Sequence, residues 1–441
     1  MYTLNPPRLL MHEIVAANPL YRGRVERLAK GLATPVAVEV FGDRDLPALL
    51  EGGLAAGRKP MGTLTAVPDP ILLFNTFRFD GNPEERLNQF SEAERKRWGG
   101  MLRELLGDRA FQWANYNQEG DAHRHDKVCR PCWRIHLQNG CVHKCAYCGC
   151  GGLLISAVNV EEYCLWLGRL AERHPWQLTY LLDDDGDPPC LEPELGVLGP
   201  LIEFFGTLEN RYLIIHTKTH NTAWLRDLDH RGHTILVWSL SGATQSRVIE
   251  PVTGTTEQRI EAARIAEEAG YTVRFKFKPI IPVNGWEDEA AAAVKLLFEK
   301  THPDVISLCS FMWMDIDELK RRLPLERLDP GFVAAAEAAK ASVADTITKP
   351  FPPEFRRRLY EHYVREIRRW NAKIPISIST ETFAMWKELE PLLGFNARNY
   401  PCGCGPFTVP GAPRLTCDPF STAQRQDEGA IPGVFPAWPK A

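Results

Sequence analysis

The feature that most constrains the fold of this 441-residue chain is a repeated alternation of two kinds of segment. From residue 133 to about 385, short runs of β-branched and aromatic residues alternate with amphipathic segments, which is typical of βα units. The pattern predicts strands at 133–137, 177–182, 212–216, 234–240, 273–280 and 305–309. It predicts helices between them at 160–173, 195–205, 221–229, 256–269 and 287–300.

Such units in series form a parallel barrel, whole or partial, whose working face lies at the C-terminal ends of the strands. We therefore predict an α/β fold with the barrel at 129–390, an N-terminal α/β extension at 1–128 and a Cys-, Gly- and Pro-rich segment at 391–441. The extension, with a candidate strand at 36–40 and a charged helix at 91–106, should pack on the barrel or form a separate domain.

Three cysteines follow the first predicted strand. Cys141, Cys145 and Cys148 stand in a C-x3-C-x2-C spacing, with Tyr147 directly before the last cysteine. Three thiolates on one loop can hold three irons of a four-iron cluster and leave the fourth iron open to another ligand. A zinc knuckle and three buried thiols are the alternatives, but zinc usually takes four ligands in paired C-x2-C units. The spacing therefore predicts a [4Fe-4S] cluster.

A second group of cysteines comes from two distant segments. Cys129 and Cys132 form a C-x2-C pair before the first strand, and Cys402 and Cys404 form a C-x-C pair near the C-terminus. In a barrel these segments are often close, so the four thiolates could share a structural zinc ion or an auxiliary iron-sulfur cluster. Alternatively, Cys402 and Cys404 belong to a glycine-rich loop or act in substrate chemistry.

Composition narrows the class of protein. Apolar residues make up 44% and charged residues 24%, which is ordinary for a soluble globular protein, and no apolar run approaches membrane-spanning length. We expect a cytoplasmic protein with no membrane contact, in which the twelve cysteines are metal ligands or free thiols. The net charge of -4 gives no general attraction to nucleic acid, so binding to nucleic acid would need a local basic patch.

The cysteine spacing and Tyr147 resemble the radical S-adenosylmethionine (radical SAM) superfamily. Later segments resemble its spore photoproduct lyase branch, namely 191–206, 216–219, 239–241, 279–287 and 378–386. The resemblance covers about 133–389 and implies a partial (β/α)6 barrel that holds SAM beside the cluster. It also implies a reductant such as flavodoxin or ferredoxin.

The resemblance assigns roles to individual residues. Lys218 and Ser239 match positions that bind SAM, and many radical SAM enzymes place an acidic residue against the SAM ammonium at the end of the second strand. That place is filled here by Asp183, Asp184 and Asp185, which could otherwise form a solvated acidic loop. The lyases carry a hydrogen-donating cysteine near the position of Asp184, where this chain has none. Cys190 is a nearby candidate, or a buried thiol.

Three functions follow from these features. The first is a radical SAM enzyme acting on a small-molecule or peptide substrate, and the second is a DNA repair enzyme like spore photoproduct lyase. The third is a zinc-stabilised binding protein without catalysis.

Three weaker signals remain in the sequence. His123 and His125 form a metal pair or a polar loop, and Trp313 lines a pocket or packs in the core with its methionine neighbours. The arginines of 356–369 indicate a salt-bridged surface helix or a phosphate-contacting face.

Overall fold

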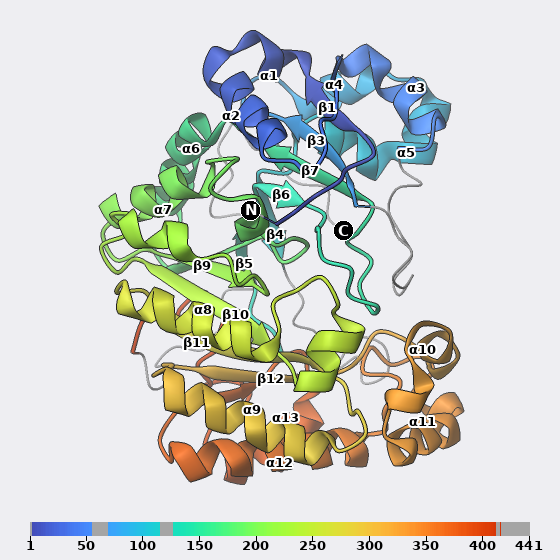
Figure 1. Cartoon of the computed structure of the whole chain (residues 1–441), viewed down its shortest axis with the longest axis vertical. Coiled ribbons are helices and arrows are strands. Elements are labelled where there is room, and N and C mark those ends of the chain that lie inside the picture. Colours follow the sequence, from blue (N-terminus) through green and yellow to red (C-terminus); the bar gives the residue numbers. More distant parts are fainter. Residues whose placement is uncertain (1, 55–68, 115–126, 412–414, 416–441) are drawn as a thin grey trace.

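Two sheets carry the fold, as the computed structural model shows for residues 2–54, 69–114, 127–411 and 415. The smaller sheet lies at the top of Figure 1, and its strand order is β2-β1-β3-β7-β6. Its strands are β1 (Leu9–His12), β2 (Val38–Phe41), β3 (Ile71–Asn75), β6 (Gln138–Asn139) and β7 (Leu153–Ala157). Its helices are α1 (Glu13–Ala17), α2 (Pro19–Lys30), α3 (Leu46–Glu51), α4 (Pro83–Asn88) and α5 (Glu92–Leu105).

The larger sheet has eight strands in the order β13-β12-β11-β10-β9-β8-β5-β4, and only the β4–β5 pair is antiparallel. The strands are β4 (Phe111–Ala114), β5 (Cys132–Ile135), β8 (Thr179–Leu182), β9 (Tyr212–Thr217), β10 (Thr234–Leu240), β11 (Thr272–Ile280), β12 (Ile306–Ser310) and β13 (Ile376–Ile378). No pairing joins β13 to β4 among the described residues, so the barrel is partial. The α/β class is confirmed, and each predicted strand occurs within two residues of its expected ends.

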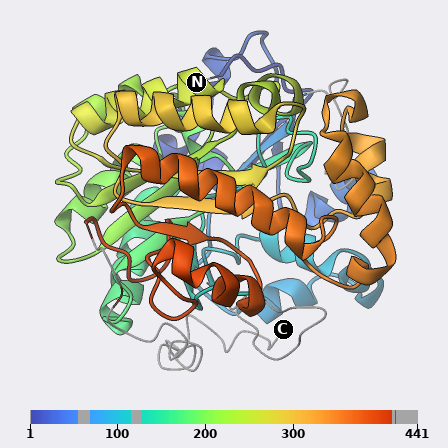
Figure 2. The same cartoon turned by 90° about the horizontal axis from the view of Figure 1, so that it is seen from below.

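Helices flank the larger sheet. They are α6 (Val160–Arg173), α7 (Leu198–Thr207), α8 (Thr256–Glu268), α9 (Trp286–Lys300), α10 (Ile316–Arg322), α11 (Pro330–Val343), α12 (Pro353–Trp370) and α13 (Phe383–Leu393). Figure 2 shows α9, α12 and α13 side by side beneath the sheet, and α12 contacts both of its neighbours. The helix predicted at 221–229 is only a 3-10 segment, η4 (Ala223–Asp227).

Local signals explain where the clearest helix begins and ends. The Thr255 hydroxyl accepts the backbone N–H of Gln258, and the Gln258 side chain accepts the Thr255 N–H, so the first turn of α8 is capped on both sides. The chain then leaves the helix at Gly270, whose φ of 91° falls in the left-handed region that glycine adopts without strain. Helix α8 therefore spans nearly the predicted residues.

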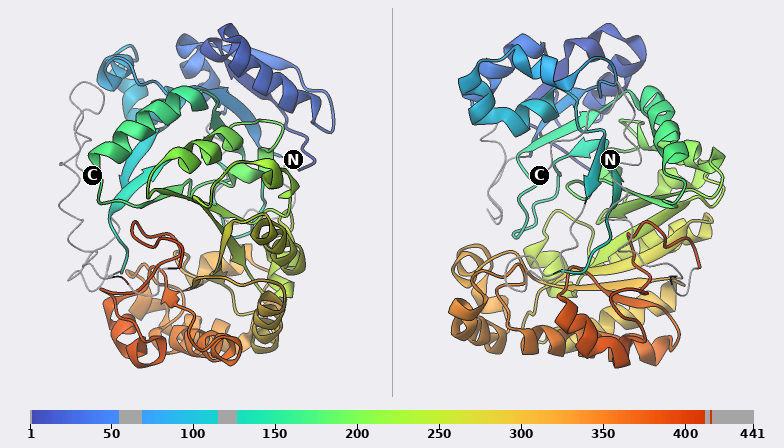
Figure 3. Two further views of the ribbon diagram at one scale, coloured as in Figure 1. Left: turned by 90° about the vertical axis from the view of Figure 1, so that its left-hand side faces the viewer. Right: turned by 180° about the vertical axis from the view of Figure 1, so that it is seen from behind.

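The two sheets exchange strands across the predicted boundary at 128/129. Strand β4 precedes this boundary yet pairs with β5 in the larger sheet, whereas β6 and β7 follow it yet complete the smaller sheet. Figure 3 shows the smaller sheet and its helices lying directly on the barrel. The expected strand at 36–40 is β2 and the expected helix at 91–106 is α5. The extension is thus built into the barrel rather than appended to it.

The C-terminal segment 401–411 lies against the inner face of the larger sheet. The backbone N–H groups of Leu178 and Thr179 both donate to the Pro406 carbonyl, at 2.9 and 3.1 Å. Cys404 packs on a small apolar cluster of inward-facing residues, Leu181, Ile214, Ile235 and Val237. This segment therefore fills part of the barrel interior.

Helix α12 differs in part from the predicted surface helix. Several of its arginines are exposed and pair with glutamates, namely Arg357, Arg358, Arg365 and Arg369. Arg356 instead is buried and donates to the Glu381 carboxylate at 2.8 Å, while Glu381 also accepts the Tyr360 hydroxyl at 2.9 Å. The surface interpretation is wrong for Arg356, which joins α12 to the loop after β13.

Replacing Arg356 should destabilise the protein far more than replacing an exposed arginine of the same helix. Arg356→Ala leaves the Glu381 carboxylate buried without its counter-ion, which costs about 3–5 kcal/mol. The control Arg365→Ala breaks only an exposed pair with Glu361 and should cost at most about 1 kcal/mol. Urea unfolding measures both free energies, and equal losses would contradict the assigned role of Arg356.

Candidate active site

The three-cysteine loop connects β6 to β7 and crosses the C-terminal end of β8. At its start, Gly140 has a φ of 103°, and a Cβ there would meet the Leu153 carbonyl oxygen at 2.1 Å, so only glycine fits. Backbone bonds then fix the loop from two sides: Gly140 N–H donates to the Asp185 carbonyl at 3.0 Å and Ala146 N–H to the Ile249 carbonyl at 2.9 Å. The loop therefore lies on the predicted working face.

The three cysteines of this loop lie close enough to one another for the charge of one to affect the others. The backbone N–H groups of His143 and Cys150 point at the sulfurs of Cys141 (3.4 Å) and Cys148 (3.5 Å), a contact that stabilises thiolates. Burial raises the pKa of Cys145 to about 12 and that of Cys141 still further, whereas hydrogen bonding from Cys150 lowers the pKa of Cys148 to about 7. Iron would therefore have to displace protons from two buried thiols.

Three sulfur donors from one loop suit a four-iron cluster whose remaining iron takes a ligand from outside the protein. The hydrogen bonds to two of the sulfurs are the kind that also tune such clusters. The donor chemistry of this loop thus fits the predicted cluster.

Glu250, at the C-terminal end of the π-helical turn η5 (Gln245–Ile249), is the electrostatic centre of the site. Its carboxylate is fully buried and accepts hydrogen bonds from Tyr147 Oη at 2.5 Å, Lys218 Nζ at 2.9 Å and Arg259 Nη2 at 2.6 Å. The Ser241 hydroxyl donates at 3.1 Å. Although burial opposes ionisation, Lys218 and Arg259 hold the pKa of Glu250 well below its ordinary value.

This carboxylate connects the cluster loop to the residues expected to bind SAM. Lys218 follows β9 and its ammonium lies 5.7 Å from the centre of the Tyr147 ring. Ser239 is on β10, and its carbonyl accepts Arg259 Nη1 at 2.9 Å. Tyr147, Lys218 and the backbone of Ser239 thus belong to one network, and their role in binding SAM stays a prediction. Glu250 and Arg259 carry no spacing signal in the sequence and were not predicted.

A second buried network lies behind the loop. His143 Nδ1 lies 2.9 Å from the Val252 carbonyl and Nε2 lies 3.0 Å from an Asp187 carboxylate oxygen. Both partners offer acceptor oxygens, so the His143 ring is held from both of its nitrogens. Asp187 also accepts the Thr217 hydroxyl and the Lys218 N–H, each at 2.7 Å. Although burial opposes it, His143 and these donors lower the pKa of Asp187.

Cys190 is part of this second network and not of the open site. Its sulfur is completely buried, 3.3 Å from His143 Nε2, and burial raises its pKa well above the ordinary value. The donor atoms of His143, Asp187 and Cys190 lie within 4.8 Å of one another, but both histidine nitrogens are already hydrogen-bonded. We therefore interpret Cys190 as the buried thiol that was the alternative to a hydrogen donor.

The side chains of the three aspartates after β8 lie in three different surroundings. Asp183 is buried and accepts the N–H groups of Leu137 (3.1 Å) and Gln138 (3.0 Å), so the prediction that it contacts SAM is corrected. Asp184 pairs with Arg134 instead of standing free for catalysis. Asp185 lines a cavity of about 220 Å³ together with Cys150 and residues on either side of the cluster loop. Asp185 is the member of the triplet still positioned for a ligand.

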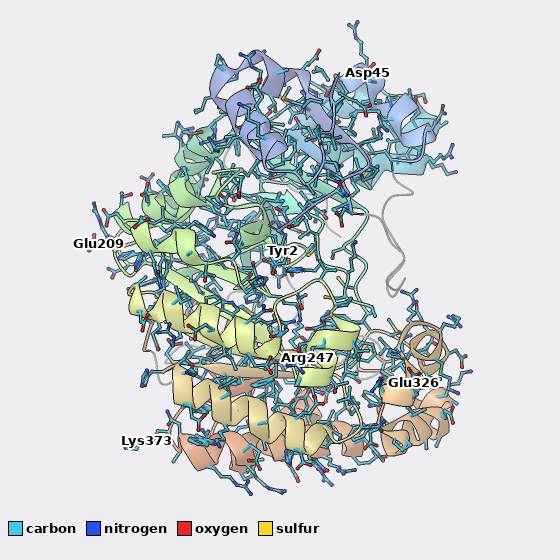
Figure 4. The ribbon with its side chains drawn as sticks, in the orientation of Figure 1. Tyr2, Asp45, Glu209, Arg247, Glu326 and Lys373 are labelled. Carbon is cyan, nitrogen blue, oxygen red and sulfur yellow. The ribbon has the colours of Figure 1, made fainter. Side chains whose placement is uncertain are left out.

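The N-terminal segment contributes a residue that the sequence did not point to. The Tyr2 ring contacts the His143 ring edge-on at 5.3 Å between centres, and the Tyr2 hydroxyl lies 3.1 Å from His220 Nδ1. Burial raises the pKa of Tyr2. Figure 4 labels Tyr2 in the middle of the molecule, between the two sheets. The start of the chain therefore shields the loop that carries the cysteines.

Cysteines of the second group lie near one another, because Cys129 and Cys404 both affect the charge of Cys132. Burial raises the pKa of Cys132 to about 12, with further contributions from Cys129 and Cys404. The sulfurs of Cys402 and Cys404 are 3.6 Å apart, but among the described residues no third cysteine, histidine or carboxylate donor lies within 4.8 Å of both. The four-cysteine zinc or iron-sulfur site remains a prediction.

Three weaker predictions concern the histidine pair, the residues around Trp313 and membrane-spanning segments. His123 and His125 lie outside the described residues. Met312 and Met314 are buried in the core, whereas Trp313 is partly exposed, with the Lys278 ammonium 5.1 Å from the centre of its ring. No described helix combines the length and the apolar character needed to cross a bilayer.

Comparison with known proteins relates this fold and this cysteine loop to one enzyme family. Residues 129–315 match the family model of spore photoproduct lyase. The chain is similar to spore photoproduct lyase of Bacillus subtilis (30% identity over 175 residues, 38% of this chain and 50% of the relative). It is also similar to that of Clostridium acetobutylicum (25% over 183 residues, 40% of this chain and 54% of the relative). The predicted resemblance to the spore photoproduct lyase branch is thus confirmed for residues 129–315.

The sequence similarity covers less than half of this chain, whereas the structural similarity covers most of it. The chain spans about half the length of the curated relatives it matches. A solved spore photoproduct lyase variant with bound AdoMet and dinucleoside spore photoproduct superposes with a TM-score of 0.57 at 14% identity. That superposition covers 86% of this chain and 99% of the other. It shows a common fold beyond the sequence match.

Removing the charge of Glu250 should destabilise the protein in a pH-dependent way. Glu250→Gln leaves Lys218 and Arg259 without their shared counter-ion, which should cost about 3–5 kcal/mol near neutral pH. Because the folded pKa of Glu250 is depressed, its stabilisation is fully present above the ordinary glutamate pKa of about 4.3 and is lost as pH falls below it.

Urea unfolding between neutral and acidic pH measures this effect. The difference in unfolding free energy between wild type and Glu250→Gln should shrink in acid. The control Glu257→Gln removes a half-exposed carboxylate that pairs with the exposed Arg247, and it should stay within about 1 kcal/mol of wild type throughout. A difference for Glu250→Gln that is constant with pH would contradict the role of its charge.

Proposed function

We propose that this protein is a radical SAM enzyme of the spore photoproduct lyase type that acts on a dinucleotide lesion in nucleic acid. The proposal depends on one observation above all: the three-cysteine loop is connected through Glu250 to Lys218 and the backbone of Ser239, at the C-terminal ends of β9 and β10. A cluster ligand loop and two predicted SAM-binding positions thus share one rigid network.

The protein's own residues would position the reactants. Cys141, Cys145 and Cys148 would hold a [4Fe-4S] cluster, which when bound supplies the electron that cleaves SAM into methionine and a 5′-deoxyadenosyl radical. Lys218 and Ser239 would hold SAM, and a low-potential reductant such as flavodoxin or ferredoxin would supply the electron. Tyr2 and the buried His143–Asp187 pair keep water away from the back of the loop.

Two features favour nucleic acid over the small-molecule or peptide substrate that composition suggested. Relatives with the matching domain are named spore photoproduct lyase, and one solved neighbour holds a dinucleoside spore photoproduct. In this chain, Lys278 near the end of β11 lies over the ring of Trp313, which follows β12 and has a φ of 76°. A partly exposed ring with a cation above it suits base stacking beside a phosphate.

Loss of one cluster cysteine should abolish SAM cleavage. Cys145→Ala removes one of three sulfur ligands, so the anaerobically reconstituted protein should lose the visible iron-sulfur absorption and form no 5′-deoxyadenosine with dithionite. The control Cys164→Ala replaces a buried thiol on α6 and should keep both properties. Undiminished 5′-deoxyadenosine from Cys145→Ala would refute the assignment of the loop.

Substrate class can be decided at Trp313. If Trp313 stacks on a base, Trp313→Ala should weaken binding of an oligonucleotide carrying spore photoproduct by about 1–3 kcal/mol. Trp370→Ala, which removes an exposed ring at the end of α12, should change nothing. Fluorescence anisotropy at several salt concentrations measures both affinities. Absence of salt-dependent binding in the wild type, with SAM still cleaved, would favour the small-molecule or peptide substrate.

A further inference from the structure

A cavity lies between the two sheets, next to the loop that carries the three cysteines. Its wider part has a volume of about 220 Å³, and a narrower part of about 30 Å³ adjoins it, because Arg109, Asn139 and Asp185 line both. A single water needs about 10–15 Å³, so the wider part has room for a molecule of several atoms. The proposed function assigns no occupant to this cavity.

The cavity is placed where both sheets present the C-terminal ends of their strands. Asn75 ends β3 and Ala157 ends β7, and these two strands of the smaller sheet are parallel. The opposite wall belongs to the larger sheet, since His136 follows β5 and Asp185 follows β8. Ligands of open α/β sheets bind outside the carboxyl ends of the strands, so the topology favours a ligand here.

His136 presents an unpaired ring nitrogen to the narrow part of the cavity. The residue is only 7% exposed, its Nδ1 lies 3.1 Å from the Asp183 carboxylate, and its Nε2 has no hydrogen-bond partner within the described part of the chain. Asp183 also accepts two backbone N–H groups, so it is the acceptor of the contact with His136. Nε2 is then the acceptor of the neutral ring, and a buried acceptor without a partner favours a ligand that brings a donor.

Hydrogen-bond donors line the same cavity. The Arg109 guanidinium is held there by Gln112 Oε1 at 3.2 Å and by the buried Glu104 carboxylate at 3.7 Å. The side-chain amide of Asn139 is a second donor. The remaining walls are largely apolar and are formed by Phe77, Leu137, Ile155 and Ala157. Apolar walls with a few polar groups are typical of a pocket for a small organic group.

A flat ring with an imide edge matches these groups. An imide carries one N–H between two carbonyl oxygens, and the cavity offers one acceptor, His136 Nε2, together with the donors Arg109 and Asn139. Thymine and uracil have this edge, whereas cytosine and adenine have no ring N–H at the corresponding position. Enzymes that act on a base read its Watson–Crick edge in a pocket with apolar walls.

We propose that this cavity is a nucleobase subsite that selects the imide edge of a pyrimidine, with His136 Nε2 accepting the ring N–H and Arg109 donating to a flanking carbonyl. The inference rests on the proposed action on nucleic acid and adds the residues that choose the base. Gly149 and Cys150 of the cysteine loop line the wider part, so a base held here lies beside the loop that would carry the cluster.

Asp183 is a positioning residue of this subsite. It does not line the cavity, but it fixes the orientation and the tautomer of His136 through Nδ1. A pocket built around one fixed acceptor rejects a ligand that lacks the matching N–H, because the acceptor then stays buried and unpaired.

Methylation of the base tests this contact, because it removes the ring N–H and leaves the charge of an oligonucleotide unchanged. The full-length, anaerobically reconstituted protein should bind a thymidine hexamer about 10- to 100-fold more tightly than a hexamer of N3-methylthymidine. Fluorescence anisotropy measures both affinities. His136→Asn keeps an amide donor for Asp183 in place of Nδ1 but removes the acceptor, so it should bind both hexamers equally. The control His302→Asn changes an exposed histidine and should discriminate as the wild type does.

The outcomes separate this subsite from the proposed function. Equal binding of both hexamers by the wild type, or discrimination that persists in His136→Asn, would overturn the subsite. Arg109→Met, which leaves Asp183 and His136 in place, should weaken binding of the thymidine hexamer, and unchanged binding would also overturn it. If SAM is cleaved but neither a hexamer nor an oligonucleotide carrying spore photoproduct binds in a salt-dependent way, the proposed nucleic-acid substrate is refuted and this inference with it.

Discussion

The site depends on a single buried carboxylate, that of Glu250. An ionised group without water is tolerated only when charges and donors surround it, and here Lys218, Arg259 and the Tyr147 hydroxyl do so. These partners come from the cysteine loop, the end of β9 and the first turns of α8. Because each partner is needed to keep the charge buried, the loop, the strand end and the helix are fixed relative to one another. Any ligand bound at Lys218 therefore meets a preorganised surface.

The exchange of strands between the two sheets supports the same loop from the opposite side. The chain leaves β5 in the larger sheet and forms β6 and β7 in the smaller sheet. The cysteine loop between β6 and β7 is therefore anchored at both ends in a different sheet from Lys218 and Ser239, the proposed SAM-binding residues. Asp183 reinforces this crossing by accepting the N–H groups of Leu137 and Gln138. An acidic residue that resembles a cofactor ligand in the sequence is thus needed to turn the backbone.

Features that depend on local patterns could be predicted from the sequence, whereas features that depend on distant partners could not. The strands and the cysteine loop were predictable because hydrophobic alternation and ligand spacing are local patterns. Glu250 and Asp187 were not predictable, because a buried carboxylate is defined by partners that lie far away in the sequence, such as Tyr147 and His143. The short strand β13 was missed because three residues are too few to show a period. The prediction that the aspartate triplet faces SAM failed for Asp183 and Asp184 because it treated three adjacent residues alike. The backbone turns at Asp183, so the three side chains lie in different surroundings.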